Sequence, residues 1–166
     1  MHVPTGELRD VPPSLARILL ATDLSPTTDL ATEWAFELAR RNEAALLVVS
    51  VIDPDDLLLP GGGFRARVDQ VRDRREAVAQ RLVERGRQTG VRVDFLVWTG
   101  PPGESIVAAA QAEGVDMILV GAHSRGRLGR LVMGSVSEYV ARHATCPVLI
   151  VREQPTTSGS AEAGAA

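Results

Sequence analysis

The residues best suited to chemistry lie between Gly121 and Ser135, where a short apolar run gives way to glycines, arginines and two serines. Glycine lets a ligand approach the backbone closely, and the first amides of a helix lack an intrahelical partner and attract anions. Arginines stand at positions 125, 127 and 130 of the same stretch. This combination is typical of a phosphate-binding loop. A tight strand-to-helix turn that uses glycine only for turning fits these residues equally well.

Short apolar runs alternate with helix-period segments along the chain, which is the pattern of β-α units on a parallel sheet. We expect strands at residues 18–22, 45–51, 91–98, 117–120 and 148–151. The sequence therefore predicts the α/β class, as a single open five-stranded parallel sheet with helices on both faces, Rossmann-like in kind. Ligands of such sheets bind outside the carboxyl ends of the strands, and Gly121 follows one of these ends.

The apolar pattern also predicts which strands are central. Residues 18–22, 45–51 and 117–120 are continuous apolar runs, as expected for strands covered on both faces. Residues 91–98 begin with apolar and charged side chains in alternation, which favours an edge strand. Residues 148–151 follow Pro147, which lacks an N–H and so favours a strand start or a sheet edge. We expect these last two strands at the edges.

Four helices are expected between the strands. The first is capped by Ser25, ends near Asn42 and carries an inward stripe of Leu30, Ala31, Trp34, Ala35 and Leu38. The other three are expected at residues 64–87, 103–113 and 129–143. The helix at 64–87 interleaves arginines with acids, which indicates a solvated face with ion pairs rather than a nucleic-acid-binding patch.

Composition limits the classes of function. The net charge of −3 argues against nucleic acid as a partner. All 18 basic residues are arginine, so a P-loop lysine, a Schiff-base lysine and the lysine of two-component receiver domains are excluded. His123 has no Cys, His or acid at metal-ligand spacing, so no metal site is predicted.

The chain of 166 residues suits one domain, expected at residues 15–152. Residues 1–14 are expected to form a flexible leader, and residues 153–166, which lack large apolar side chains, a disordered tail. No apolar run has the length of a secretory core or a membrane span, so no membrane partner is expected. The single cysteine, Cys146, fits a reducing compartment, and we expect a cytoplasmic protein.

Several motifs at matching spacing resemble the universal stress protein family. They lie at residues 18–25, 49–54, 100–106, 116–121, 134–135 and 145–151. The resemblance implies an adenine nucleotide alpha hydrolase-like fold. It also implies the nucleotide-binding motif of that family, which is Gly, two residues, Gly, nine residues, then Gly-Ser or Gly-Thr.

Gly121, Gly134 and Ser135 match that motif, whereas Ser124 stands where the second glycine is expected. A serine there costs on the order of 1 kcal/mol if the loop needs a positive φ, and its Cβ narrows the approach of a phosphate. Gly126 lies close enough in sequence for the loop to adjust. We therefore expect binding with an affinity that Ser124 lowers.

The resemblance implies a role for each remaining site residue. Ala21, Thr22 and Asp23 end the first strand where adenosine lies, and the Asp23 carboxylate accepts from a ribose hydroxyl. Val51 contacts adenine, and Val120 packs on the nucleotide. Gly134, Ser135 and Val136 offer backbone N–H groups to phosphates. The alternatives are a capping role for Asp23 and plain core positions for both valines.

The implied function is an adenine nucleotide-binding regulatory module that takes ATP or AMP. Asp53 stands at the end of the second strand, a position from which it could reach a nucleotide-bound Mg²⁺ through water. A homodimer is implied through an edge strand at residues 146–151. A dimeric scaffold that binds no nucleotide is the main alternative. An ATP-using enzyme is the third, but the chain lacks the nucleophile and metal motifs that fast chemistry needs, so no catalytic residue is predicted.

Overall fold

A computed structural model describes residues 14–24, 30–58, 61–122 and 134–152 of the chain. It contains a five-stranded parallel sheet in the order β3-β2-β1-β4-β5. The strands are β1 (Arg17–Ala21), β2 (Ala45–Ile52), β3 (Val93–Thr99), β4 (Met117–Gly121) and β5 (Val148–Val151). The predicted α/β class is confirmed, and so are the two predicted edge strands. The expected leader and tail fall outside the described residues except for Ser14.

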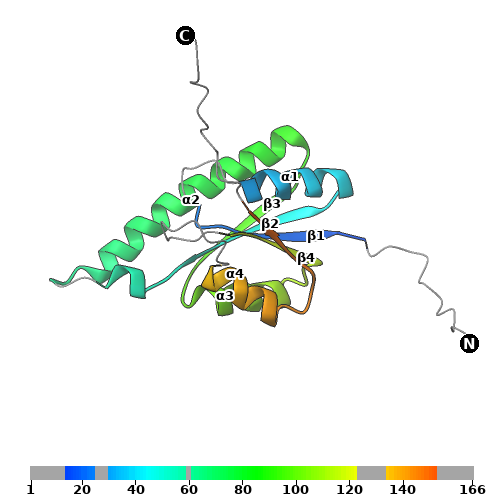
Figure 1. The fold of residues 1–166 in the computed structure, drawn as a ribbon. Coiled ribbons are helices and arrows are strands. Elements are labelled where there is room, and N and C mark those ends of the chain that lie inside the picture. Colours follow the sequence, from blue (N-terminus) through cyan, green and yellow to red (C-terminus); the bar gives the residue numbers. More distant parts are fainter. Residues whose placement is uncertain (1–13, 25–29, 59–60, 123–133, 153–166) are drawn as a thin grey trace, which may run out of the picture.

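Helices cover both faces of the sheet. They are α1 (Leu30–Asn42), α2 (Phe64–Thr89), α3 (Pro102–Ala112) and α4 (Ser135–His143), with a short 3-10 turn η1 (Asp55–Leu57) before α2. Figure 1 shows α1 and α2 together on one face and α3 and α4 together on the other. The sheet is therefore the middle layer of three.

Alternate residues of the central strands supply two apolar clusters, one on each face. Ile18, Leu20 and Val48 face α1 and α2, and none is exposed. Leu19 and Val49 lie in the cluster with residues of α3 and α4, and neither is exposed. A strand that buries both faces must be apolar throughout, which explains the continuous runs in the sequence.

The inward face of α1 differs from the predicted stripe. Trp34 is 49% exposed and Leu30 is 38% exposed, whereas Phe36 is 4% exposed. Ala31, Ala35 and Ala39 form most of the buried face. Small side chains let the helix lie close to the sheet, and this close approach turns the bulky Trp34 outward. Phe36 is covered from outside by the Arg85 guanidinium, 4.2 Å from the ring centroid.

Two predicted boundaries were wrong. β3 starts at Val93 because the Val91 N–H instead donates to the Gly86 carbonyl (2.9 Å) where the chain leaves α2. A Cβ on Gly86 would lie 2.5 Å from the Val91 oxygen, so only glycine allows this approach. Helix α4 starts at Ser135, after an extended Gly134 (φ −62°, ψ 151°), and not at residue 129. Residues 129–133 lie outside the described part of the chain.

Helices α3 and α4 make close contact at Gly103. A Cβ on this glycine would lie 2.8 Å from Cγ and Cδ1 of the Tyr139 ring in α4. Real side chains do not approach so closely, so the packing of α4 against α3 depends on the missing methyl group. The same α3 also covers β2, which places α4 relative to the sheet.

Polar contacts connect β1 and β4 at the amino end of the sheet. One Asp116 carboxylate oxygen, Oδ2, accepts from the backbone N–H groups of both Ala16 and Arg17, at 2.8 Å each. The Asp116 N–H in turn donates to the Arg17 carbonyl (2.8 Å). These bonds join the start of β1 to the start of β4, so Asp116 has a structural role.

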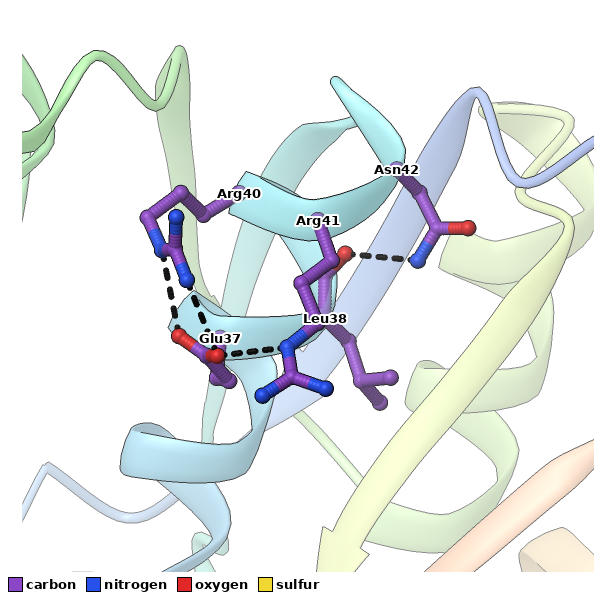
Figure 2. A network of polar contacts seen from close by, with 5 residues as sticks. All are labelled: Glu37, Leu38, Arg40, Arg41 and Asn42. Carbon is purple, nitrogen blue, oxygen red and sulfur yellow. Dashed lines mark hydrogen bonds and ion pairs between the residues drawn. The ribbon is translucent and has the colours of Figure 1, made fainter.

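A second polar network lies within the last turns of α1 (Figure 2). The Glu37 carboxylate accepts from the guanidinium groups of Arg40 and Arg41, and Asn42 Nδ2 donates to the Leu38 carbonyl (2.8 Å). The hydrogen bonds from Arg40 and Arg41 lower the pKa of Glu37 to about 2. Because α1 ends where the chain turns into β2, this network lies at the amino end of the sheet.

Candidate functional site

The strand order reverses beside β1. The chain builds β2 and then β3 on one side of β1 and returns to place β4 and β5 on the other side. Ala21, at the carboxyl end of β1, pairs with Val49 of β2 and with Val120 of β4. Ligands of open α/β sheets bind in the crevice at such a switch point. The predicted site residues on the first and fourth strands therefore lie at the expected place.

One apolar cluster brings together predicted site residues from four elements. Ala21, Val51 and Val120 are all buried in it, and Val136 of α4 packs against it. Their side chains therefore belong to the core, which is the alternative stated above for both valines. What these residues can offer a ligand is their backbone and the edge of an apolar surface.

The turn after β1 is strained. Leu24 has a φ of 54°, in the left-handed region, and its N–H donates to Thr22 Oγ1 (3.1 Å). This conformation costs a leucine about 1 kcal/mol. Burial of the Leu24 side chain, which is 7% exposed, offsets that cost. The exposed Asp23 lies between these two residues, so the turn determines where its carboxylate stands.

Leu24 was missed in the sequence because leucine carries no signal for a positive φ. Strained backbone of this kind concentrates at ligand sites. The hydrogen bond to Thr22 Oγ1 also means that the predicted site residue Thr22 uses its hydroxyl inside the turn.

Among the residues that the structure describes, the first amides of α4 have no hydrogen-bond partner. Gly134 is its N-cap with an extended backbone, and no side chain in the described part of the chain caps the helix there. Ser137 Oγ instead donates to the Gly134 carbonyl (2.9 Å). The N–H groups of Ser135 and Val136 precede the first intrahelical donor, Glu138, whose N–H donates to the Gly134 oxygen (3.0 Å). Such a helix start favours an anion.

The loop between β4 and α4 can be followed only at its ends. Gly121 pairs with Val151 of β5, and the Ala122 N–H donates to the Val151 carbonyl (2.8 Å). Ser124, Gly126, His123 and the three arginines of the loop lie outside the described residues. The roles expected for them therefore stay predictions.

Two arginines of α2 reach the carboxyl ends of the neighbouring strands. Arg72 Nη1 donates to the Val97 carbonyl (2.8 Å) of β3, and Nη2 donates to Thr99 Oγ1 (3.1 Å). Arg75 Nη1 donates to Ser50 Oγ (3.0 Å) and to the Val51 carbonyl (2.6 Å) of β2. The interpretation of the α2 arginines as a solvated, ion-paired face was therefore wrong for Arg72. A guanidinium satisfies carbonyls that a sheet leaves unpaired at its margin.

Asp53, the residue expected to reach Mg²⁺ through water, accepts from the Asp55 N–H (3.0 Å) at the turn that leads into η1. In the described part of the chain, no group of three or more His, Cys, Asp or Glu side chains is placed to hold a metal ion. Within the same residues, no helix is both long and apolar enough to cross a membrane.

The fold defines an open parallel α/β domain whose strand order reverses beside β1. Residues 15–152 match the universal stress protein family, and the chain belongs to that family. A universal stress protein of Thermus aquaticus, encoded in the 3′ region of QAH/OAS sulfhydrylase, is 38% identical over 136 residues, which cover 81% of this chain and 97% of the relative. The crystal structure of a family protein from Burkholderia pseudomallei is similar with a TM-score of 0.69 and 30% identity, covering 84% of this chain and 98% of that one.

Three more distant structures share the fold and were solved with a nucleotide. They are a universal stress protein in complex with cAMP, an Arabidopsis thaliana family protein with AMP bound, and the Archaeoglobus fulgidus protein in complex with dAMP. Their TM-scores are 0.61, 0.59 and 0.60 at 23%, 19% and 22% identity. They cover 84%, 88% and 83% of this chain, and 98%, 97% and 98% of their own chains are matched.

Proposed function

We propose that this universal stress protein binds an adenine nucleotide, ATP or AMP, at the carboxyl edge of its sheet and acts as a regulatory module. The observation that carries the proposal is the start of α4, which none of the described side chains caps and whose Val136 packs on the same cluster as Ala21 and Val120 at the switch point. The nucleotide complexes of the three family structures support the choice of ligand class.

The phosphates are proposed to lie against the start of α4. The N–H groups of Ser135 and Val136 and the backbone of Gly134 and Gly121 would donate to phosphate oxygens, as anions at helix starts commonly accept. Ser124 and Gly126 would complete the loop around them. Mg²⁺ would bind through phosphate oxygens and water.

The nucleoside is proposed to lie over the ends of β1 and β2. Asp23 is exposed beside the strained Leu24, where its carboxylate would accept from ribose hydroxyls. Ala21, Thr22 and Val120 would line the sugar and base, and the backbone of Val51 would contact adenine. The buried side chains of this cluster would then form the floor beneath the base.

The proposal is tested by denaturing freshly purified protein and chromatographing the small molecules released. The emptied protein is then titrated with ATP and with AMP, each with and without Mg²⁺, by calorimetry. We expect adenine nucleotide near one equivalent per chain, or binding on titration. No released nucleotide and no binding at millimolar ATP would support the dimeric scaffold that binds no ligand.

Substitution of Gly134 by valine tests the phosphate end. A branched side chain at the N-cap blocks the approach to the amides, so we expect Gly134→Val to weaken ATP binding by about 100-fold or more. The matched control is Ala141→Val, at an exposed position later in the same helix. We expect Ser124→Gly to strengthen binding by several-fold, on the order of a 1 kcal/mol relief of backbone strain. Equal affinity in all these proteins would mean that the phosphates lie elsewhere.

We further propose a cytoplasmic homodimer in which β5 pairs antiparallel with its copy across residues 146–151. The support is geometric. The bonds from the Ile118 N–H to the Pro147 oxygen (3.0 Å) and from the Ala122 N–H to the Val151 oxygen (2.8 Å) fix which peptide groups face β4. The intervening groups of Val148 and Ile150 therefore point away from the sheet. An edge strand with outward peptide groups invites another strand.

A further inference from the structure

One side of α1 is turned away from α2. Phe36 and Glu33 mark the side that meets α2, because the Arg85 guanidinium lies over the Phe36 ring and pairs with the Glu33 carboxylate. Trp34 and Leu38, which lie one turn apart, are about half a turn of the helix away from Phe36. Helix α2 lies over β2 and β3, whereas α1 lies over β1 and also contacts β4 and β5. Trp34 and Leu38 are therefore on the side of α1 that faces the β5 edge of the sheet.

An apolar surface runs from this side of α1 onto β5. Trp34 is 49% exposed, and Leu38 and Leu149 of β5 are half-buried. Both leucines pack against the core cluster on the face of the sheet that α1 covers. An exposed aromatic ring that continues into half-buried leucines is typical of a surface used for association, because burying it removes apolar area from water.

Strand β5 alone is too small to hold a stable dimer. It has four residues, Val148–Val151, and the outward peptide groups are those of Val148 and Ile150. Specific interfaces bury on the order of 800 Å² on each partner and involve about 20–30 residues a side. The pairing of two such strands supplies a small part of that area. A dimer formed at this edge therefore needs side chains from the elements beside β5.

The symmetry of an antiparallel strand pair indicates which elements these are. Its twofold axis is perpendicular to the sheet, so the α1 helices of both copies lie on the same face. Hydrogen bonds between Val148 of one copy and Ile150 of the other place the two Leu149 residues opposite each other. The Leu149 side chain lies on the face that α1 covers. The two Leu149 side chains would thus lie between the two α1 helices, with the Trp34 side of each helix toward the axis.

We propose that Trp34 and Leu38 of α1 belong to the homodimer interface, where they pack with Leu149 and with the same residues of a second copy across the twofold axis. This role rests on the β5 dimer proposed above. The partner is a second copy of the chain because the apolar surface is continuous with the edge strand and one twofold axis brings both onto their own copies. The α1 side chains supply buried area that the two short strands lack.

Analytical ultracentrifugation of the full chain over a range of concentrations measures the dimer Kd. We expect Trp34→Ala to raise this Kd about 10- to 30-fold, because large aromatic side chains in the middle of an interface carry much of the binding energy. Trp34→Phe keeps an aromatic ring and should stay within about threefold of the wild type. The matched control is Trp98→Ala, at an exposed tryptophan on the opposite edge strand β3, which should leave the Kd unchanged. Urea denaturation checks that each variant folds.

Tryptophan fluorescence gives a second measurement that does not depend on the folding of Trp34→Ala. The chain has two tryptophans, so Trp98→Phe leaves Trp34 as the reporter. Its emission should shift to longer wavelength when dilution dissociates the dimer, because the ring then meets water.

An unchanged Kd in folded Trp34→Ala, or an emission that stays constant while the dimer dissociates, would overturn the role of α1 and leave the β5 dimer standing. A wild-type chain that is monomeric at every concentration would assign Trp34 to a different partner, and both the proposed dimer and the role of α1 would fail.

Discussion

The two edges of the sheet are built differently. At the β3 edge, the bond from the Leu46 N–H to the Arg92 oxygen (2.8 Å) and that from the Gly100 N–H to the Ile52 oxygen (3.0 Å) show which peptide groups face β2. The Val97 carbonyl belongs to the other set and faces outward. Arg72 of the long α2 donates to this oxygen (2.8 Å). A charged side chain thus covers an exposed edge group.

At the β5 edge the outward groups of Val148 and Ile150 have no hydrogen-bond partner among the residues that the structure describes. The strand is short and apolar, and three of its four residues are only partly buried. Natural sheets protect their edges with charged side chains unless an edge is used for pairing. The difference between the edges therefore indicates which one is available to a second copy of the chain.

Proline substitutions at matched outward positions give the largest expected effect. Ile150→Pro removes one outward N–H from each copy without touching the ladder to β4, because that N–H faces away from the sheet. We expect the dimer Kd to rise about 30- to 100-fold, the equivalent of ~2–3 kcal/mol. Light scattering coupled to size-exclusion chromatography measures the change.

The control is Phe95→Pro, at an outward position of β3. It should reduce folding stability to a similar extent but leave the protein dimeric. A dimer that survives Ile150→Pro and dissociates with Phe95→Pro would assign the interface to the opposite edge.

Removal of the Arg72 side chain, which covers the β3 edge, should have an intermediate effect, on folding stability. Arg72→Ala leaves the Val97 carbonyl and Thr99 without their guanidinium, and we expect a loss of about 1–2 kcal/mol in the free energy of unfolding, measured by urea denaturation. Arg74→Ala, at an exposed position of the same helix, should change stability by less than about 0.5 kcal/mol. Equal losses in both variants would show that Arg72 does not protect the edge.

The smallest effect concerns the ion pair that ties α1 to α2, the helix that covers β3. Two hydrogen bonds from Arg85 lower the pKa of Glu33 below its ordinary value of 4.5. A lowered pKa in the folded state stabilises the protein above pH 4.5, and this contribution is lost as the pH falls through the folded-state pKa. The side chain of Glu33 is 49% exposed, so solvent screening limits the effect to at most about 1 kcal/mol.

Glu33→Gln should therefore lower the stability near pH 7 slightly and flatten its fall between about pH 5 and pH 3. Urea denaturation at a series of pH values measures both. The matched control is Glu84→Gln, which removes an acid from a longer, exposed pair within α2. This variant should show the same fall in stability between about pH 5 and pH 3 as the wild type. If stability fell between about pH 5 and pH 3 as steeply in Glu33→Gln as in the wild type, the role of this ion pair would be contradicted.

The sheet could be predicted because burial leaves a direct trace in sequence. A central strand covered on both faces is continuously apolar, as at residues 45–51, and the alternation at residues 91–98 reflects the half-covered β3. The phase of α1 could not be predicted in the same way. Trp34 is the more apolar choice for an inward position, but the close packing of three alanines against the sheet decides the rotation of the helix.

For the candidate site, the family resemblance indicated residues at strand ends, and their part in binding stays a prediction. Ala21 and Val120 lie at the switch point because the strand order requires it. The hydrogen-bond partners of Arg72 and Arg75 were not predictable. The sequence of a mixed-charge helix looks the same whether a long side chain points to solvent or reaches the end of a strand. The positive φ of Leu24 could not be predicted either, because leucine rarely adopts this conformation.

The missing methyl group at Gly103, a buried residue at the start of α3, allows the close contact with Tyr139 of α4. Since the ring of Tyr139 occupies the volume that any larger residue would need, a substitution in α3 has to displace the helix whose first amides are proposed to bind phosphate. A mutation in α3 that touches none of the proposed ligand-binding residues would therefore shift the amides proposed to bind phosphate, and its effect on nucleotide affinity would resemble that of a change in the proposed site itself.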